Sequence, residues 1–404
     1  MRHVRDLSLI QPIKALVRAQ LLPRPKSGRQ PSLTASPVVI AGMFRTGNGI
    51  GRAARCAYAA LCAEGVMPLA VDISGMLNQV DLSPSMPLVP FPAARAGTLI
   101  LFANPPELET CLWKLGLRRW HDWRIIGAWA WESRLAPAAW RRQANFVSEI
   151  WAPSQFCAAA FGVYGRPVFR VPHFLSPEEA PKAAARDASG PLHILTLADA
   201  RSSLTRKNPL AAVGMFRAAF RPDEAVQLTL KCRGLDLYPD YLARLRAAID
   251  GDPRIEFLDQ TLSDEDHALL LARADIILSP HRSEGFGLSL AEAMAHGKCV
   301  VATGWSGNIE FMDSSCAVLL PFKLVPLIDP TGVYEAQPGA VWADPDVEAG
   351  ARILRELFES PAMRAAIGEM ARLAIGEKLR SRFYRAALEG ETKLSDGTYR
   401  RMAP

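Results

Sequence analysis

The sequence contains no apolar run long enough to cross a membrane. A spanning helix requires roughly 18 to 20 apolar residues, and the hydrophobic residues, 49% of the 404-residue chain, are divided into shorter runs. The first residues also lack the charged region, apolar stretch and cleavage site of a secretory signal. We therefore expect a large globular protein located in the cytoplasm.

Paired cysteines are missing as well. The seven cysteines form no C-x-x-C pair, are odd in number and mostly interrupt apolar segments, which is typical of reduced thiols in a protein core. They predict a reducing compartment. No group of Cys, His, Asp and Glu residues has the spacing of a metal site, so we expect neither a metal nor another bound cofactor.

Excess charge is confined to one end of the chain. The formal net charge is +6, and residues 1–30 hold seven basic residues against one acidic residue. Pro12 can begin a helix that continues to Leu22 with apolar residues on one face. Such a helix could lie on an anionic membrane surface, could pack on the protein itself, or could be part of a poorly ordered basic arm. We expect no nucleic-acid partner, because no basic groove with interleaved aromatic residues is evident elsewhere.

Strand and helix patterns alternate along the rest of the chain. Short apolar runs rich in β-branched residues are followed by glycine-containing loops and by segments with helical periodicity. This alternation predicts two doubly wound α/β domains that face each other across a cleft. The predicted parts are a basic leader and linker at 1–36, a first domain at 37–180, a second domain at 188–375, and a final helix at 376–404 that crosses back to the first domain.

The stretch 279–308 organises the second domain. A β-rich run over 274–280 leads into it and is closed by proline, and 299–303 has the composition of another buried strand. Between them, 288–295 has the composition of a helix. The unit is therefore a strand, a glycine-containing loop, a helix and a strand, and such units bind ligands at the carboxyl ends of their strands.

Two carboxylates flank this loop. Glu284 lies on the loop and Glu292 lies about two turns into the helix, while Gly285 and Gly287 allow the backbone to approach an anion closely. The spacing suits a phosphate flanked by two polyols. Electrostatic capping of the helix by Glu284, with Glu292 as a solvated helix residue, explains the same pattern.

Cations follow the first strand of the second domain. Arg201 and Lys207 are six residues apart across a loop and a helix start, so both could converge on one anion. A diphosphate leaving group needs such compensation, because negative charge accumulates on it as its bond breaks. A solvated basic loop is the alternative, and Arg206 is the weaker candidate for a third cation.

The first domain offers a second glycine loop and several aromatic residues. Gly49 and Gly51 follow its first strand in a G-x-G-x-G pattern, which only superficially resembles a dinucleotide-binding fingerprint. A predicted strand over 124–132 ends in Trp129, Trp131 and Glu132. Aromatic faces stack on sugars and carboxylates bind their hydroxyls, so these residues are candidates for an acceptor site; core packing and helix capping are the alternatives.

The segment Glu284–Met294 resembles the E-x7-E signature of retaining nucleotide-sugar glycosyltransferases with the GT-B fold, the group often called family GT4. The similarity continues through residue 308. It implies that Glu284 holds the donor sugar, that the loop amides hold sugar and diphosphate, and that Glu292 holds the ribose. The same resemblance assigns Arg201 and Lys207 to the donor diphosphate.

The resemblance also supplies a set of binding residues. The implied donor-binding residues are Gly285, Phe286, Gly287, Leu288, Glu292, Phe257, Leu258, Gly49 and Gly51. Family members often carry a histidine near the end of the strand that leads to Glu132; this sequence has none there, so Glu132 is the replacement candidate. His173, near the predicted domain boundary, is the remaining candidate on the acceptor side.

These observations predict a retaining glycosyltransferase that moves a hexose of mannose or glucose type from a GDP- or UDP-linked donor to a glycan or lipid-linked oligosaccharide acceptor. Cell-surface polysaccharide biosynthesis is the expected context, with peripheral contact to the inner face of the membrane through residues 1–30. The alternatives are an inert glycan-binding or scaffold protein, an epimerase or phosphorylase of the same fold, and a nicotinamide-dependent oxidoreductase. The donor base, the acceptor and the oligomeric state are not determined by the sequence.

Overall fold

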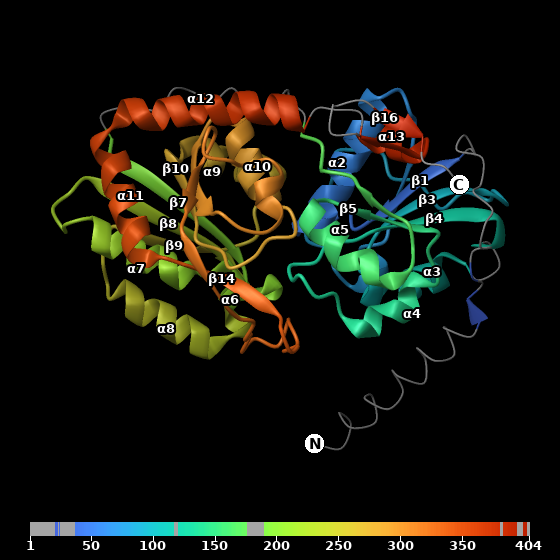
Figure 1. Cartoon of the computed structure of the whole chain (residues 1–404), viewed down its shortest axis with the longest axis horizontal. Coiled ribbons are helices and arrows are strands. Elements are labelled where there is room, and N and C mark those ends of the chain that lie inside the picture. The colour runs from blue at the N-terminus through green and yellow to red at the C-terminus, as the bar shows by residue number, and fades with distance from the viewer. Residues whose placement is uncertain are drawn as a thin grey trace, which may run out of the picture. The chain divides into compact units, whose positions relative to one another are not determined.

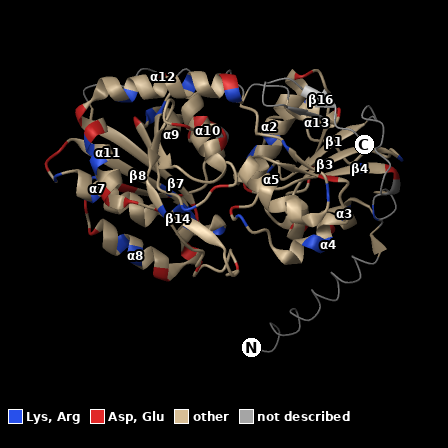
Figure 2. Ribbon diagram, in the orientation of Figure 1, with Lys and Arg blue, Asp and Glu red and all other residues tan. Residues whose placement is uncertain are grey.

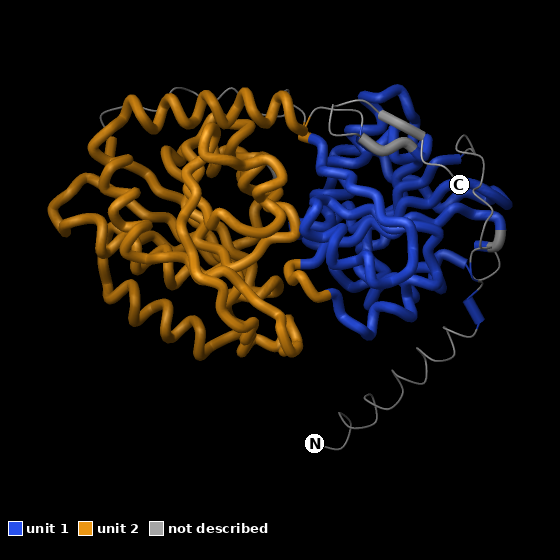
Figure 3. Tube along the Cα trace, in the orientation of Figure 1, with its two compact units in different colours: residues 1–131, 136–174, 382–404 blue, residues 132–135, 175–381 orange. Residues whose placement is uncertain are grey.

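The computed structural model describes residues 21–22, 24, 37–116, 120–175, 190–379, 383–393 and 399–401. The chain divides into two compact units (Figure 3): unit 1 comprises residues 1–131, 136–174 and 382–404, and unit 2 comprises residues 132–135 and 175–381. The predictions for the leader before residue 21, for the linker at 25–36 and for the boundary at 176–189 lie outside the described residues.

The sheet of unit 1 consists of six parallel strands in the described residues, with the spatial order β2-β1-β3-β4-β5-β6. Its strands are β1 (Val38–Gly42), β2 (Leu69–Asp72), β3 (Gly97–Phe102), β4 (Trp123–Ala128), β5 (Glu149–Ala152) and β6 (Val168–Arg170). β4 is shorter than predicted because the chain leaves the sheet after Ala128. The predicted aromatic residues and Glu132 therefore follow the strand instead of ending it.

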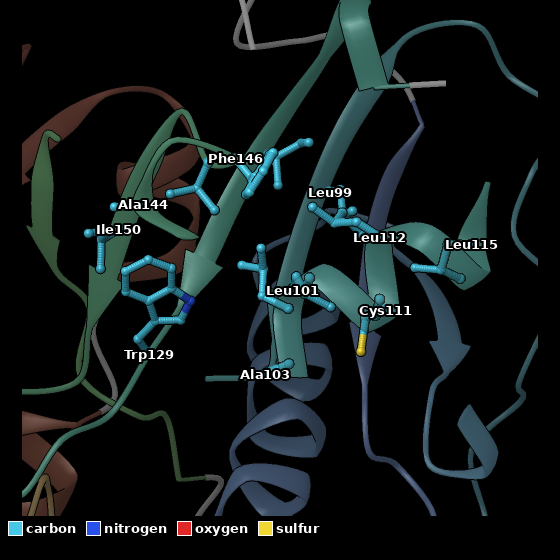
Figure 4. Packing of buried hydrophobic residues seen from close by; sticks show 14 of the residues in the cluster. Leu99, Leu101, Ala103, Cys111, Leu112, Leu115, Trp129, Ala144, Phe146 and Ile150 are labelled. Carbon is cyan, nitrogen blue, oxygen red and sulfur yellow. The ribbon is translucent and has the colours of Figure 1, made fainter. Parts of the chain in front are cut away.

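Both faces of this sheet are covered by helices (Figure 1). The helices of unit 1 are α2 (Gly49–Ala63), α3 (Pro105–Leu115), α4 (Arg141–Ala144), α5 (Gln155–Phe161) and α13 (Phe383–Leu388). Successive strand residues point to opposite faces, and two separate hydrophobic clusters result. Figure 4 shows the cluster in which Leu99 and Leu101 of β3 meet Cys111 and Leu112 of α3. The other cluster joins the alternate strand residues to α2 and α13.

The helix α13 is fixed to unit 1 by a buried arginine. Arg124 of β4 donates two hydrogen bonds to Glu149, of 3.1 and 2.8 Å, and two more to the carbonyl oxygens of Leu388 and Ala387 at the end of α13. Carbonyl groups at the end of a helix lack hydrogen-bond partners within the helix. The guanidinium of Arg124 donates to two of these carbonyl groups. The last part of the chain thus belongs to unit 1, although α12 before it belongs to unit 2.

The sheet of unit 2 has the spatial order β12-β11-β10-β7-β8-β9, and its paired strands are parallel. Its strands are β7 (Leu192–Asp199), β8 (Val226–Arg233), β9 (Ile255–Asp259), β10 (Ile276–Ser279), β11 (Cys299–Thr303) and β12 (Val318–Leu320). The order along the sheet reverses between β7 and β10. In open α/β sheets this reversal is where ligands bind, outside the carboxyl ends of the strands.

The helices of unit 2 enclose its sheet. They are α6 (Leu204–Lys207), α7 (Pro209–Ala219), α8 (Pro239–Ile249), α9 (Asp264–Arg273), α10 (Leu288–Ala295), α11 (Val347–Glu359) and α12 (Pro361–Lys378). Apolar residues of α7, α8 and α11 form one core with the strands. Charged residues are frequent along the helices and loops (Figure 2), and the strands β10, β11 and β12 contain none. This arrangement leaves the loops after β7 and β10 to carry the chemistry.

A hairpin interrupts the alternation in unit 2. β13 (Phe322–Pro326) pairs antiparallel with β14 (Val341–Pro345), where the sequence predicts only a proline-rich excursion over 324–342. Arg282, on the loop after β10, holds the base of this hairpin: it bonds Asp344 at 2.7 Å, and its carbonyl oxygen accepts from the backbone N–H of Ala343. The hairpin is thus attached to the loop that bears Glu284.

The prediction of two doubly wound α/β units is confirmed by these two parallel sheets. Besides the hairpin of β13 and β14, a second small sheet pairs β15 (Glu391–Lys393) with β16 (Tyr399–Arg401). Among the described residues, no helix combines the length and the apolar character needed to span a bilayer.

Candidate active site

Glu284 is the centre of the candidate site in unit 2. Its Oε1 atom lies 2.6 Å from Lys207 Nζ and 3.2 Å from Arg206 Nη1. Both cations come from α6, just after β7, and the carboxylate comes from the loop after β10. These are the two strands at which the order of the sheet reverses. The fold therefore assembles a buried carboxylate and two cations at the expected ligand-binding edge.

The two cations keep Glu284 ionised. Burial alone would raise the pKa of this carboxyl group, but Lys207, Arg206 and His281 outweigh burial and lower the pKa to about 2. An ionised carboxylate in a site with little water binds sugar hydroxyls as a strong acceptor. The carboxylate of Glu284 can therefore accept hydrogen bonds without first losing a proton.

The two cations differ in solvent exposure and in the number of their contacts. The Arg206 side chain is only 2% exposed, whereas the Lys207 side chain is 18% exposed. Arg206 also donates from Nε to the carbonyl oxygen of Ser202 and from Nη1 to that of Ser283. Burial opposes its charge, but Tyr334, Glu284 and Glu132 raise the pKa of Arg206 above its ordinary value. Arg206 is therefore a fixed cation, and Lys207 is the one that solvent reaches.

A buried histidine shapes the loop that carries Glu284. His281 Nε2 lies 3.1 Å from Asn308 Oδ1, and the amide nitrogen of Asn308 donates to the carbonyl oxygen of Thr303. Because Oδ1 can only accept, Nε2 carries the proton, and Nδ1 accepts from the hydroxyl of Ser279 at 3.0 Å. Burial is the main cause that lowers the pKa of His281 to about 4. The imidazole is neutral at pH 7 and orients the loop.

Glycine is required at two points around this loop. A Cβ atom at Gly307 would lie 2.1 Å from the carbonyl oxygen of Gly285, so a larger residue would displace the loop. Gly287 has a φ of +92° and precedes α10, which no side chain caps at its N-terminus. The first amide groups of an uncapped helix are donors suited to an anion. Predicted donor-binding residues Phe286 and Leu288 flank this point.

Glu292 lies on α10, eight residues after Glu284, which lies on the loop before this helix. It is buried, and its Oε2 lies 3.5 Å from Nε2 of His267 on α9. The sequence-based alternative of a solvated helix residue is therefore wrong for Glu292. Its carboxylate lies in the same unit as Glu284.

The structure separates Arg201 from the other predicted cation. Arg201 is exposed and follows β7, with its backbone N–H donating to Asp199 at 3.0 Å. Its side chain lies near Gly234, after β8. Within the part of the chain that the structure describes, no hydrogen bond or ion pair joins this side chain to Glu284 or Lys207. Lys207 shares Glu284 with Arg206, and the convergence of Arg201 and Lys207 on a diphosphate stays a prediction.

Glu132 belongs to unit 2 through its contacts. Its Oε2 accepts a 2.7 Å hydrogen bond from the hydroxyl of Tyr334, which lies between β13 and β14. The guanidinium carbon of Arg206 lies 5.9 Å from the centroid of the Tyr334 ring. Nearby, Arg134 lies over the ring of Trp305 at 5.6 Å. Glu132 is thus connected through Tyr334 to the cation that holds Glu284, and the predicted helix-capping alternative does not describe it.

The aromatic candidates of unit 1 have different surroundings. Trp129 is 1% exposed and packs edge-on against Trp140, so it is assigned to the core and not to a sugar platform. Trp131 is only partly buried, with its ring centroid 4.8 Å from that of Trp140. His173 is half-buried, and its Nδ1 lies 3.4 Å from the hydroxyl of Tyr384. Of these candidates, Trp131 and His173 retain exposed atoms.

The glycine loop of unit 1 is explained largely by packing. The side chain of Asn48 caps α2 by accepting from the N–H of Gly51 at 2.8 Å, and a Cβ at Gly51 would lie 2.4 Å from the carbonyl oxygen of Met43. Gly49 has open space around it. A dinucleotide-binding fingerprint also has an acidic residue about 20 positions after its glycines. Asp72 stands at such a position, but it accepts from the N–H and the hydroxyl of Ser74. These contacts disfavour the oxidoreductase alternative.

Two further expectations concern the nucleotide base and metals. Phe257 and Leu258 are half-buried in β9, at the edge of the sheet of unit 2. In the described residues, no group of three or more His, Cys, Asp and Glu side chains is placed to hold a metal ion.

Sequence reasoning undervalued Arg206 and missed His281 and Tyr334. Arg206 adjoins Lys207 in the sequence, so proximity was a usable signal for it. His281 lies three residues before Glu284, within the motif region. Tyr334 is 50 residues from Glu284, and no local pattern points to it.

Part of unit 2 is similar to a known family of proteins. Residues 202–334 match the family model described as "Glycosyl transferases group 1". This range contains Arg206, Lys207, Glu284, Glu292 and Tyr334. A search of curated proteins finds no match. The family match supports glycosyl transfer as the class of activity.

Solved structures match both units of the chain. HepE of Anabaena, in complex with UDP and glucose, is 16% identical, with 87% of this chain and 96% of that chain covered and a TM-score of 0.59. A glycosyltransferase from Rickettsia africae is 14% identical, with coverages of 88% and 97% and a TM-score of 0.60. Sucrose-phosphate synthase of Thermosynechococcus elongatus is 15% identical, with coverages of 87% and 97% and a TM-score of 0.59. The TM-scores and coverages show a shared fold, and at these identities they show the fold alone.

Proposed function

We propose that this protein is a retaining glycosyltransferase that moves a hexose from a nucleotide diphosphate sugar to a hydroxyl group of a glycan acceptor. The observation that carries the proposal is the ionised, buried Glu284, held by Lys207 and Arg206 beside the uncapped start of α10. This reaction needs a carboxylate that binds sugar hydroxyls. It also needs a cation and helix amides that bind a diphosphate.

Each group has a role in the proposed reaction. Glu284 binds hydroxyls of the donor sugar, and the amides from Gly285 to Leu288 bind the diphosphate. Lys207 compensates the negative charge that accumulates on the diphosphate as the glycosidic bond breaks. The acceptor hydroxyl attacks the face from which the diphosphate departs, and a donor phosphate oxygen takes its proton. These side chains position the reactants and stabilise charge.

Other predicted residues complete the donor site. Glu292 binds the ribose hydroxyls, and Phe257 and Leu258 contact the base. Arg201 is exposed, and its proposed role toward the diphosphate is secondary to that of Lys207. From unit 1, Gly49 has the open space that a close approach of the backbone to a phosphate requires.

The donor is proposed to carry uridine. HepE, which shares the fold, binds UDP and UDP-glucose, and this supports UDP over GDP as the first nucleotide to test. The proposed acceptor is a glycan or lipid-linked oligosaccharide, with Trp131 and His173 as the remaining unit 1 candidates for contact with it. A role in cell-surface polysaccharide biosynthesis is part of the same proposal.

A panel of nucleotides tests this function directly. We expect UDP or GDP, and the corresponding hexose donors, to raise the melting temperature of the protein, because ligands that bind only the folded state stabilise it. Transfer assays with the best donor should then give a product whose anomeric configuration matches the donor, as read by NMR. Stabilisation by donors without transfer or donor hydrolysis would favour the inert scaffold. Inversion of the anomeric centre would contradict a retaining mechanism.

We further propose a cytoplasmic location with peripheral attachment to an anionic membrane surface through the basic leader. All seven cysteines are free thiols, which supports a reducing compartment. Leu22 lies in the hydrophobic core of unit 1, so a truncation should stop before it.

The truncated protein lacking residues 1–20 tests the attachment. We expect it to cosediment less with vesicles that contain anionic lipid than the full chain does, because four of the seven basic residues of the leader are removed. Its melting temperature should stay unchanged, since Leu22 is retained. Equal binding of both proteins to the vesicles would refute the attachment.

A further inference from the structure

The ion pairs of Glu284 conflict with the proposed task of Lys207. Lys207 Nζ lies 2.6 Å from Glu284 Oε1, yet in the proposed reaction this ammonium must neutralise the donor diphosphate. If Lys207 turns to the diphosphate, Glu284 loses its shortest ion pair. A buried carboxylate without a cation takes up a proton or becomes strongly unfavourable.

Arg206 resolves this conflict. It approaches the same Oε1 atom at 3.2 Å, and it is held from other sides by the carbonyl oxygens of Ser202 and Ser283. These contacts do not involve Lys207. Arg206 can therefore keep its place and its pairing with Glu284 when Lys207 moves away.

Tyr334 and Glu132 also hold Arg206 in place. The ring of Tyr334 lies 5.9 Å from its guanidinium carbon, and the hydroxyl of Tyr334 donates to Glu132 at 2.7 Å. The segment that carries Tyr334 is itself anchored, because Asp329 accepts from the backbone N–H of Tyr334 and from the hydroxyl of Ser203. These contacts thus connect the loop between β13 and β14 to the start of α6.

We propose that Arg206, fixed by Tyr334 and Glu132, is the permanent counter-ion of Glu284, so that Lys207 can pass from Glu284 to the diphosphate when a donor binds. The inference rests on the proposed function. It makes Arg206, Tyr334 and Glu132 positioning residues of the donor site. It also explains why the site has two cations for one carboxylate: one stays and one is exchanged.

The proposal predicts a change in proton uptake. The groups that act on Glu284 are Lys207 and Arg206 from α6 and His281 from its own loop, with Tyr334 and Glu132 beyond Arg206. In the wild type, Glu284 stays ionised when Lys207 leaves, because Arg206 remains. In an Arg206→Gln protein, the departure of Lys207 leaves Glu284 without a cation, and its pKa rises. Nucleotide binding should then be accompanied by the uptake of a proton.

The test is calorimetric titration with UDP or GDP, whichever stabilises the wild type, in buffers of different ionisation enthalpy. We expect Arg206→Gln to take up as much as one proton more than the wild type on binding. By linkage, its affinity relative to wild type should then improve as the pH falls, by up to about tenfold per pH unit. Comparison with the wild type removes the ionisation of the nucleotide itself.

Three further variants keep the test decisive. Arg206→Lys retains a cation and should restore wild-type proton uptake. Tyr334→Phe removes one oxygen atom and should show a smaller uptake of the same sign, and it carries the test if Arg206→Gln does not fold. Arg355→Gln is the matched control, because Arg355 lies on α11 of the same unit and pairs with Glu224; its proton uptake should equal that of the wild type.

The outcomes separate the two proposals. Nucleotide binding with wild-type proton uptake in both Arg206→Gln and Tyr334→Phe would overturn the counter-ion role and leave the proposed function standing. Binding of neither UDP nor GDP by the wild type would overturn the proposed function and this inference together.

Discussion

Sugar transfer should fall by at least about 100- to 1,000-fold when either Lys207 or Glu284 is replaced by alanine, which is the loss typical of removing one preorganised electrostatic group from an active site. Lys207→Ala removes the exchangeable cation from the diphosphate. Glu284→Ala removes the acceptor for the sugar hydroxyls and leaves two cations without their carboxylate. Transfer of radiolabelled sugar from the donor identified by thermal shift measures both effects.

Folding must be preserved for these losses to be informative. Circular dichroism and the melting temperature should show that both proteins retain the native fold. Glu284→Gln, which keeps the size of the side chain, separates loss of charge from loss of packing. The control is Glu369→Ala, since Glu369 is exposed on α12 and pairs with Arg372, and its turnover should match that of the wild type. Unchanged turnover in both site variants would refute the assignment of the site.

The second large effect concerns stability. We expect Arg124→Ala to lower the free energy of unfolding of unit 1 by about 3–5 kcal/mol, because removing one partner of a buried ion pair leaves the other charge uncompensated. Arg124 and Glu149 have side chains only 4% and 10% exposed. The variant also removes the Arg124 donor from the carbonyl oxygen of Leu388 and one of two donors from that of Ala387, which keeps its bond from the N–H of Gly390. Chemical denaturation followed by tryptophan fluorescence measures the loss, since unit 1 holds a buried cluster of tryptophans.

An exposed ion pair provides the comparison. Arg372 Nη2 lies 2.6 Å from Glu369 Oε1, and the two side chains are 50% and 55% exposed. Such exposed ion pairs contribute little to stability. Arg372→Ala should therefore unfold at the wild-type denaturant concentration. Equal stabilities of the Arg124→Ala protein and the wild type would show that the pair does not anchor α13.

Several local features were predictable because their causes are local. The start of α10 at Leu288 follows from the two glycines before it, and the apolar runs of β10 and β11 are short and bounded by turn residues. The start of α2 at Gly49 also has a local cause, because the side chain of Asn48 caps the helix there.

The hairpin shows where local patterns stop being informative. Its proline-rich sequence predicts an irregular excursion, yet β13 and β14 pair across an intervening loop. This pairing places Tyr334 against Arg206, and Glu132 joins them from 202 residues earlier in the chain. Neither contact can be predicted from sequence spacing, because each is made by chain segments that only the folded unit brings together.

By itself, the sequence determined the fold class and the loop that carries Glu284 and Glu292, because periodicity, glycine positions and motif spacing act within a few turns of chain. Only the tertiary structure decided which cations meet Glu284. It placed Arg206 and Lys207 on one carboxylate oxygen and Arg201 elsewhere, and it buried Trp129 in the core. The physical reason is that ion pairing and burial depend on distances between strands that are remote in sequence, and those distances are set by the packing of the whole unit.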